Sequence, residues 1–345
     1  MVRSRVAMLY GIGDIRIEET DISNIGHDEV LVRIRAATTC GTDVKIFQRG
    51  YVSGVIGFPS PFGHEWAGDI VEIGGGVKKF SVGMRVRGGN SAPCLQCEMC
   101  REGRFNLCED RVWLWGAYAD YIKVPESIVK LNLHEIPPHL SYEEAAVTEP
   151  LACVLHGALK TNIRPGETVA IIGSGPIGIL HLQLAKHMGA SKIIITDTVD
   201  ERLKVAESLG ADVIVNINYE DPIECVKRET KGYGAHVVIE CVGTLETWMQ
   251  ALNLVRKGGR VLMFGGCPPN TEIKVNTELL HYGEVSIIGS FHASPQEFHQ
   301  ALNLIASNIV NVKPLITDSY PLERIREIFQ MLTTSKKALK IAIKP

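Results

Sequence analysis

The sequence predicts an α/β protein with two domains. Residues 1–151 and 291–345 are expected to form a β-rich domain, and residues 152–290 a doubly wound parallel-sheet domain. Three observations support this division: a length of 345 residues, dense glycine and proline punctuation in the first part, and apolar runs that alternate with helical patterns from about residue 165. A chain of this length exceeds the size at which one hydrophobic core usually stops growing.

The first part of the chain has the pattern of short strands. Residues 30–37 alternate apolar and polar side chains, as a half-buried strand does. Glycines and prolines recur at 57–63, and three glycines follow at 74–76. Short strands joined by such turns predict a compact barrel-like or sandwich domain.

The second part contains short apolar runs separated by helical patterns. These runs lie at residues 169–173, 193–196, 213–215, 236–240, 260–266 and 285–290. Residues 176–190, between the first two runs, have apolar side chains at helical spacing. Continuous apolar strands separated by helices predict a parallel sheet covered on both faces, and six of them match two βαβαβ halves. We expect helices at 295–306 and near 321–333 and a strand at 338–345, in a segment that returns to the first domain.

Composition excludes two classes of partner. The formal net charge is -3, so no basic excess exists to attract nucleic acid or an anionic membrane. The N-terminal residues lack the apolar stretch of a signal peptide, and no apolar run is long enough to span a bilayer. We therefore expect a cytoplasmic protein whose partner is a small molecule.

A glycine motif stands at the start of the second domain. Gly173, Gly175 and Gly178 fit the pattern GxGxxG, directly after an apolar strand and at the opening of a helix. Such glycines permit a tight turn, a close approach of the backbone to a pyrophosphate, and close packing of helix against strand. The helix N-terminus, with Pro176 and Ile177, offers free N–H groups to phosphates. The motif predicts a dinucleotide site.

An acidic residue at the end of the next strand bears on the choice of dinucleotide. Asp197 lies nineteen residues after Gly178, where a carboxylate accepts hydrogen bonds from the adenosine ribose and repels a 2′-phosphate. It favours NAD over NADP, and Arg202 is a hint in the other direction. The alternative interpretation is a helix cap, although Asp200 already looks like the cap of the helix that follows. The nicotinamide is expected over the later strand ends, near Val242, Gly265 and Ser290.

Four of the nine cysteines crowd into fifteen positions, at Cys94, Cys97, Cys100 and Cys108. Four thiolates at this short spacing suit tetrahedral Zn²⁺ in a closed structural site. The alternatives are a disulfide framework, four unligated thiols, or a zinc knuckle that binds nucleic acid. A reducing cytosol disfavours the first, and the small number of basic residues in the lobe disfavours the last.

A second set of metal-ligating residues is spread along the first domain. Cys40 follows the first clear strand, His64 and Glu65 come from a loop rich in glycine and proline, and Glu149 precedes the second domain. One thiol, one imidazole and one carboxylate make a catalytic zinc site with an open fourth position. Each residue also has an ordinary explanation, since a single buried cysteine usually behaves as a small hydrophobic residue and Glu149 suits a helix start.

Taken together, these motifs resemble a known family. The order and spacing of CGTD at 40–43, GHE at 63–65, the cysteine lobe, EP at 149–150 and GxGxxG are similar to those of the zinc-dependent medium-chain alcohol dehydrogenases. The resemblance covers nearly the whole chain. Glutamate at 149, where enzymes of simple alcohols carry cysteine, points to the branch of sorbitol, glucose and threonine dehydrogenases. It implies a GroES-like catalytic domain, a Rossmann domain, and a homo-oligomer (a tetramer or a dimer).

The resemblance also implies an activity, the transfer of a hydride between a secondary alcohol and NAD, with one catalytic and one structural Zn²⁺. In sorbitol-type members the carboxylate after the histidine binds the metal, so Glu65 is placed ahead of Glu149 as the third ligand. Thr42 is interpreted as the first proton acceptor, and Asp43 as a residue that orients a ligand. The aromatic residues expected to shape the substrate pocket are Tyr51, Phe58, Trp66, Trp113, Trp115 and Phe291.

The chain departs from the family pattern at Lys45, where many members carry a proton-relay histidine. Lys45 is expected to hydrogen-bond a substrate hydroxyl or to take over the relay, the alternative being a side chain that faces solvent or pairs with a carboxylate. This favours a polyol, sugar or cyclitol over L-threonine. An L-threonine 3-dehydrogenase-like enzyme, a simple secondary alcohol dehydrogenase, a zinc-free reductase and a non-catalytic zinc-binding scaffold remain as alternatives.

Overall fold

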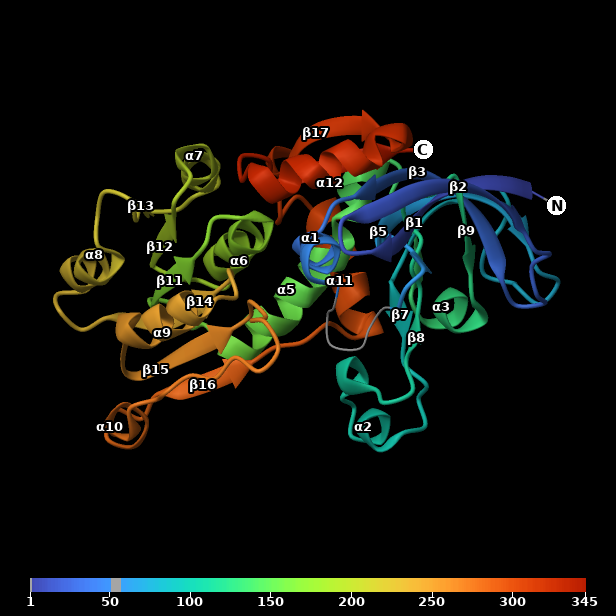
Figure 1. The fold of residues 1–345 in the computed structure, drawn as a ribbon. Coiled ribbons are helices and arrows are strands. Elements are labelled where there is room, and N and C mark those ends of the chain that lie inside the picture. Colours follow the sequence, from blue (N-terminus) through green and yellow to red (C-terminus); the bar gives the residue numbers. More distant parts are fainter. Residues whose placement is uncertain (1, 51–56) are drawn as a thin grey trace. The chain divides into compact units, whose positions relative to one another are not determined.

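The computed structural model describes residues 2–50 and 57–345, which form two compact units (Figure 1). Unit 1 comprises Met1–Ala152, Ala293–Asn308 and Val312–Pro345, and unit 2 comprises Cys153–His292 and Ile309–Asn311. Among the described residues, no helix is both long enough and apolar enough to cross a membrane.

Strand β3 is the centre of unit 1, because it pairs antiparallel with β5, β9 and β18. The main sheet has the order β10-β6-β5-β3-β18-β17, and a smaller sheet has the order β2-β1-β4. The strands of this unit are β1 (Val2–Gly11), β2 (Asp14–Ile22), β3 (Val30–Thr38), β4 (Ser60–Pro61), β5 (Glu65–Ile73), β6 (Arg85–Gly88), β7 (Ser91–Ala92), β8 (Val112–Trp113), β9 (Tyr121–Val124), β10 (Leu133–Glu135), β17 (Ile316–Pro321) and β18 (Lys340–Lys344).

Short helices cover and close these sheets. They are α1 (Gly41–Arg49), α2 (Glu98–Arg101), α3 (Glu126–Leu131), α4 (Tyr142–Ala146), α11 (Pro295–Ala306) and α12 (Ile325–Thr334). Helix α12 begins later than the sequence predicts, because a 3-10 turn occupies Leu322–Arg324 first. Its buried Phe329 ring lies 5.2 Å from Phe62 and 5.6 Å from Phe47, and this aromatic packing joins α12, α1 and the chain just before His64.

Unit 2 is a six-stranded parallel sheet in the order β13-β12-β11-β14-β15-β16, which confirms the doubly wound fold class. Its strands are β11 (Thr168–Ile172), β12 (Lys192–Asp197), β13 (Val213–Asn216), β14 (Ala235–Glu240), β15 (Val255–Met263) and β16 (Ser286–Gly289). Its helices are α6 (Pro176–His187), α7 (Asp200–Ser208), α8 (Pro222–Glu229), α9 (Leu245–Leu254) and α10 (Thr277–His281), and α5 (Thr148–Thr161) leads into it from unit 1.

The glycine motif forms the turn between β11 and α6. Gly173 has a φ of 96°, a left-handed conformation that suits glycine, and Gly175 caps the helix. A Cβ atom on Gly178 would lie 1.8 Å from the carbonyl oxygen of Gly173, whereas one on Gly175 would meet nothing closer than Arg202 Nη1 at 3.6 Å. Gly178 is therefore required for packing, and Gly175 leaves open space beside the turn.

The prediction that Asp200 caps the following helix is wrong. Asp200 is the first residue of α7, and its carboxylate accepts a hydrogen bond from Asn216 Nδ2 at 2.6 Å. The N-cap position belongs to Val199, which makes no side-chain cap. Asp197 orders this turn instead, because its Oδ1 accepts from the N–H groups of Thr198 (2.7 Å) and Val199 (3.1 Å).

We predict that alanine substitution destabilises the fold at one glycine of the motif and has little effect at another. Gly178→Ala should lower the free energy of unfolding by about 2 kcal/mol, because backbone atoms must move to admit the new methyl group. Gly175→Ala is the matched control and should change it by less than about 0.5 kcal/mol. Urea unfolding of both variants measures the difference, and equal losses would contradict the described packing of the turn.

Candidate functional site

Helix α1 fixes the first candidate ligand. Cys40 is its N-cap, and the Sγ of Cys40 accepts a hydrogen bond from the Thr42 N–H at 3.4 Å. The carboxylate of Asp43 reaches back and accepts from the Cys40 N–H at 3.3 Å, which completes a capping box. The thiol therefore lies at the N-terminus of the helix, held by hydrogen bonds within its own first turn.

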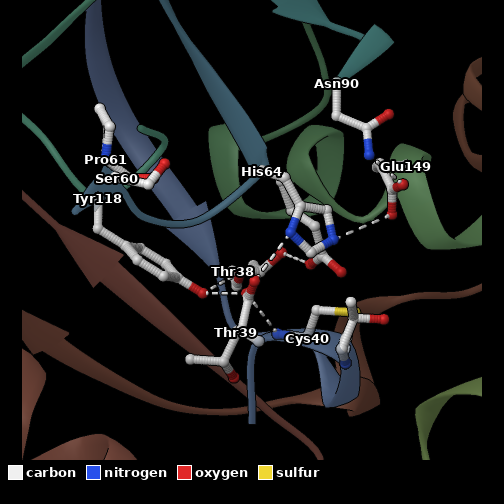
Figure 2. Close-up of polar contacts among 12 residues, drawn as sticks. Thr38, Thr39, Cys40, Ser60, Pro61, His64, Asn90, Tyr118 and Glu149 are labelled. Atoms are coloured by element: carbon white, nitrogen blue, oxygen red, sulfur yellow. Dashed lines mark hydrogen bonds and ion pairs between the residues drawn. The ribbon is translucent and has the colours of Figure 1, made fainter. Parts of the chain in front are cut away.

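Asp43 also orients the second candidate ligand. Asp43 Oδ1 lies 2.9 Å from His64 Nδ1, and its Oδ2 accepts a hydrogen bond from the Tyr118 hydroxyl at 2.6 Å. Gly63 has a φ of 86° and lies so close to Tyr118 that a Cβ there would come within 2.6 Å of the ring. The imidazole is thus held by Nδ1, and Figure 2 shows its other nitrogen directed toward Glu149.

Buried charges surround this imidazole. Burial alone lowers the pKa of His64, but the carboxylate of Asp43 and the thiol of Cys40 raise it well above its usual value. Burial and the same carboxylate raise the pKa of Tyr118 well above its ordinary range, so its hydroxyl remains a donor. The His64–Asp43 pair therefore has the form of a metal-binding histidine braced by a carboxylate.

Two carboxylates complete the centre. One ligand atom each of Cys40, His64 and Glu65 lies within 4.8 Å of the others. Glu149 Oε2 lies 3.9 Å from His64 Nε2, and its Oε1 accepts a hydrogen bond from Asn90 Nδ2 at 2.9 Å (Figure 2). Burial raises the pKa of Glu149. The nearby positive charge of His64 opposes this effect but does not cancel it. A thiol, an imidazole and a carboxylate this close together fit the donor set of zinc, with the imidazole and the carboxylate buried and the thiol half-buried.

Sequence reasoning missed several buried polar residues at this centre, among them Asn90, Arg87 and Lys340. The Nζ of Lys340 bonds both carboxylate oxygens of Glu65, at 2.8 and 2.5 Å. Burial lowers the pKa of Arg87 to about 9, although the charge of Glu149 partly offsets this effect. Lys340 stands inside the apolar strand ALKIAIKP, which is an unusual place for an ammonium, but nothing in the sequence names its partner.

Two predicted residues of the proton relay and several predicted pocket residues also lie in unit 1. Thr42 and Lys45 are half-buried on the first turns of α1. Trp115 packs edge-on against the ring of His64 with the ring centroids 5.2 Å apart, whereas Trp66 is buried in the core, against Gly88. Tyr51 lies outside the described residues.

The lobe around α2 is seen in Figure 1, and the side chains of its four cysteines converge. Their Sγ atoms lie within 4.8 Å of one another. Cys94 Sγ accepts from the Cys97 N–H at 3.3 Å, and N–H groups of Glu109 and Cys100 lower the pKa of the Cys97 thiol to about 6. Burial raises the pKa of Cys100 to about 12. Four sulfur atoms at one point suit a closed tetrahedral site.

In unit 2, the carboxylate of Asp197 accepts hydrogen bonds from the glycine turn of its own chain. Asp197 Oδ2 accepts from the N–H (2.7 Å) and the hydroxyl (3.0 Å) of Ser174, so the carboxylate ties the glycine turn to the end of β12. Burial lowers the pKa of Arg202, an effect that the charge of Asp197 opposes. Arg202 lies beside Gly175 on the open side of the turn, where a phosphate would approach.

The residues expected near the nicotinamide lie at the carboxyl ends of neighbouring parallel strands. Val242 follows β14, and its Cγ2 is 2.8 Å from the position of a Cβ on Gly173. Gly265 follows β15, where a Cβ would lie 2.4 Å from the nitrogen of Gly243. Ser290 directly follows β16. Ligands of open α/β sheets bind at this edge, next to the glycine turn.

Comparisons with known proteins identify the family of both parts of the chain. The zinc-binding dehydrogenase family matches residues 176–307, and the alcohol dehydrogenase GroES-like domain matches residues 26–137. The sorbitol dehydrogenase of Bacillus subtilis is 36% identical over 99% of this chain and 97% of its own. The L-threonine 3-dehydrogenase of Caldanaerobacter subterraneus is 34% identical over 92% of this chain and 91% of its own. A solved zinc-binding dehydrogenase of Sinorhizobium meliloti, bound to NADP, has a TM-score of 0.92 and 30% identity, with complete coverage of both chains.

These matches cover the metal-ligand motifs and the glycine turn alike. A zinc-free reductase and a non-catalytic scaffold do not account for relatives that are named as dehydrogenases over nearly the full length of the chain. The chain therefore belongs to the zinc-dependent medium-chain alcohol dehydrogenases, in their polyol branch, and is an oxidoreductase that uses zinc and a nicotinamide cofactor.

Proposed function

We propose that this protein transfers a hydride between a secondary alcohol of a polyol, sugar or cyclitol and NAD. The main support is the cluster of Cys40, His64 and Glu65, whose ligand atoms lie within 4.8 Å of one another. Relatives named as sorbitol dehydrogenase, D-arabitol-phosphate dehydrogenase and L-idonate 5-dehydrogenase support a hydroxyl-rich substrate.

The chemistry of the donor sets supports two zinc positions. Cys40 and His64, with Glu65 or Glu149, would hold the catalytic ion, and the four cysteines of the lobe a structural one. When bound, the catalytic ion supplies a Lewis acid that polarises the substrate oxygen. Asp43 holds the His64 ring so that Nε2 is available to a metal.

Protein groups near Cys40 are proposed to handle the proton and the substrate. Thr42 follows Cys40 by two residues, and its hydroxyl is proposed to accept the proton of the reacting alcohol. Lys45, one helical turn further along α1, is proposed to hydrogen-bond a neighbouring substrate hydroxyl or to continue the relay. An ammonium in this position favours a substrate with several acceptor oxygens.

Unit 2 is proposed to bind the cofactor. The glycine turn and the N-terminus of α6 would hold the pyrophosphate, and Val242, Gly265 and Ser290 would line the nicotinamide site. Asp197 supports NAD, whereas Arg202 and the NADP bound by the Sinorhizobium relative support NADP. We favour NAD, because the Asp197 carboxylate repels a 2′-phosphate at the end of β12.

A cytoplasmic homo-oligomer is proposed for the assembled enzyme. Strand β16 lies at the edge of the parallel sheet, and the side chain of Ile287 on it is 38% exposed. An exposed apolar edge strand favours pairing with a second copy. We propose a dimer or tetramer built on this edge.

Substrate class is tested by NAD reduction over a panel of polyols, cyclitols, sugars, amino acids and simple alcohols. Polyols or cyclitols should be the best substrates. Lys45→Met should lower kcat/KM for them about tenfold, the cost of one charged hydrogen bond, and simple secondary alcohols should lose much less. Lys78→Met, at an exposed lysine, is the control. If primary aliphatic alcohols were the best substrates, the polyol assignment would be wrong.

The two zinc positions should respond differently to substitution. Elemental analysis should find two zinc ions per chain. Cys100→Ser should lose one of them and lower the melting temperature, because a structural zinc contributes folding energy. Cys40→Ser should keep most of the stability and lose turnover, and Cys267→Ser, outside both clusters, should change neither. Normal stability and zinc content in Cys100→Ser would rule out the structural site.

Cofactor preference is tested at Asp197. Asp197→Ala should reduce the ratio of kcat/KM for NAD to that for NADP, because it removes both a ribose acceptor and a charge that repels phosphate. Asp200→Ala removes a carboxylate three residues away that is bonded to Asn216, and it should leave the ratio unchanged. An unmodified enzyme that uses NAD and NADP equally well would contradict the assignment.

A further inference from the structure

A thiol and an imidazole of unit 2 face each other at the carboxyl edge of the parallel sheet. Cys153 is on α5, and His292 lies three residues after the end of β16. The Sγ of Cys153 is 3.9 Å from Nδ1 of His292, and both side chains are half-buried. Neither residue belongs to the catalytic cluster or to the cysteine lobe, so the proposed reaction leaves this pair unexplained.

Helix α5 is held along the end of β16 by the positions that follow Cys153. Lys160 Nζ donates a hydrogen bond to the Gly289 carbonyl at 2.8 Å, and a Cβ on Gly157 would lie 3.2 Å from Ser290 Oγ. Residues 153, 157 and 160 lie on one face of the helix, because they are spaced four and three positions apart. The packing of helix against strand therefore brings Cys153 to the chain that follows β16.

The backbone of His292 contributes to the same contact. Its φ is 57°, in the left-handed region. A residue other than glycine adopts this conformation at a cost in energy, and such residues cluster at functional sites. In this conformation the ring presents Nδ1 to the thiol of Cys153. The pair is thus held in place by the helix on one side and by a strained turn on the other.

The separation of the two atoms fits two ligands of one tetrahedral ion. Zinc binds sulfur at about 2.3 Å and imidazole nitrogen at about 2.0 Å, so tetrahedral coordination places the two ligand atoms about 3.6 Å apart. The observed 3.9 Å differs from this by a few tenths of an ångström. Glu149 lies one helical turn before Cys153 on α5, and its carboxylate adds negative charge on the same face of the helix. A thiolate and an imidazole are donors that suit zinc.

We propose that Cys153 and His292 bind an additional Zn²⁺ ion, which inhibits the enzyme by blocking the nicotinamide site. Two protein donors leave the other positions to water, so this ion should be held more weakly than the other two and should bind only when zinc is in excess. His292 lies two residues after Ser290, which is expected to line the nicotinamide site, so the ion and the cofactor would exclude each other. Binding of the ion rests on Cys153 and His292, whereas its inhibitory effect rests on the proposed function.

Equilibrium dialysis of the holoenzyme against increasing free Zn²⁺ tests the binding. The unmodified enzyme should take up one zinc ion beyond those that it retains in zinc-free buffer. Cys153→Ser and His292→Gln should each weaken the binding of this ion at least about tenfold, because each variant lacks a ligand. Cys267→Ser changes a half-buried thiol outside the clusters of metal-ligating residues, and it should bind the ion as tightly as the unmodified enzyme.

The retained zinc ions and the melting temperature control for a general effect on the fold, and both should be unchanged in Cys153→Ser and in His292→Gln. If one of these variants does not fold, the other carries the test. An unmodified enzyme that takes up no additional zinc would overturn the proposal, and so would a variant that still binds the additional ion with unchanged affinity.

Competition with the cofactor tests the inhibition. Excess zinc should inhibit NAD reduction competitively with NAD, and a chelator that removes only the additional ion should restore the rate. Saturating NADH should weaken the binding of the additional ion at least about tenfold, because two ligands that exclude each other do so reciprocally. An enzyme that oxidises polyols at the same rate with the ion bound would overturn the inhibitory role. An enzyme that takes up the ion but oxidises no alcohol would overturn the proposed function instead.

Discussion

The carboxylate of Asp43 joins three segments that are distant in the sequence. It accepts hydrogen bonds from the Cys40 N–H, from the ring of His64 and from the Tyr118 hydroxyl, and it is completely buried. A buried carboxylate must find such donors, so each of the three segments is held where Asp43 requires it. The relative positions of Cys40 and His64, and with them every proposed step of the chemistry, depend on this one anion.

Around Asp43, unit 1 carries a set of buried charges that a protein core ordinarily avoids. Lys340 compensates Glu65, and Arg87 lies near enough to Glu149 for each charge to shift the pKa of the other. Among the described residues, Nε and Nη1 of Arg87 have no hydrogen-bond partner. Such desolvated charge is expensive in stability and is typical of functional centres, where it controls which groups remain ionised.

Local sequence patterns were sufficient to predict those parts of the fold and the site whose contacts lie between residues close together in the sequence. The glycine turn, the four-cysteine lobe and the segment from Cys40 to Asp43 were predicted, because each works through contacts within a few residues. The parallel strands were predicted because burial on both faces leaves continuous apolar runs.

Long-range partners could not be predicted in the same way. Lys340 and Glu65 are 275 positions apart, and Asn90 and Glu149 are 59 apart, so their pairing follows from the folded sheet and from no local pattern. Asp200 was misassigned because a carboxylate at a helix start looks the same in sequence whether it occupies the N-cap or the first turn. Likewise, the sequence places Asp197 at the end of a strand but cannot show that its carboxylate accepts two hydrogen bonds from Ser174.

Asp43 is proposed to orient His64 so that Cys40 and Nε2 of the imidazole hold a metal. Anomalous diffraction at the zinc edge from crystals of the purified enzyme tests it most directly. We expect two peaks per chain, one amid the four cysteines and one bonded to Cys40 Sγ and His64 Nε2, with Asp43 hydrogen-bonded to Nδ1. A single peak at the cysteine lobe, or a metal bound to Nδ1 of His64, would contradict it.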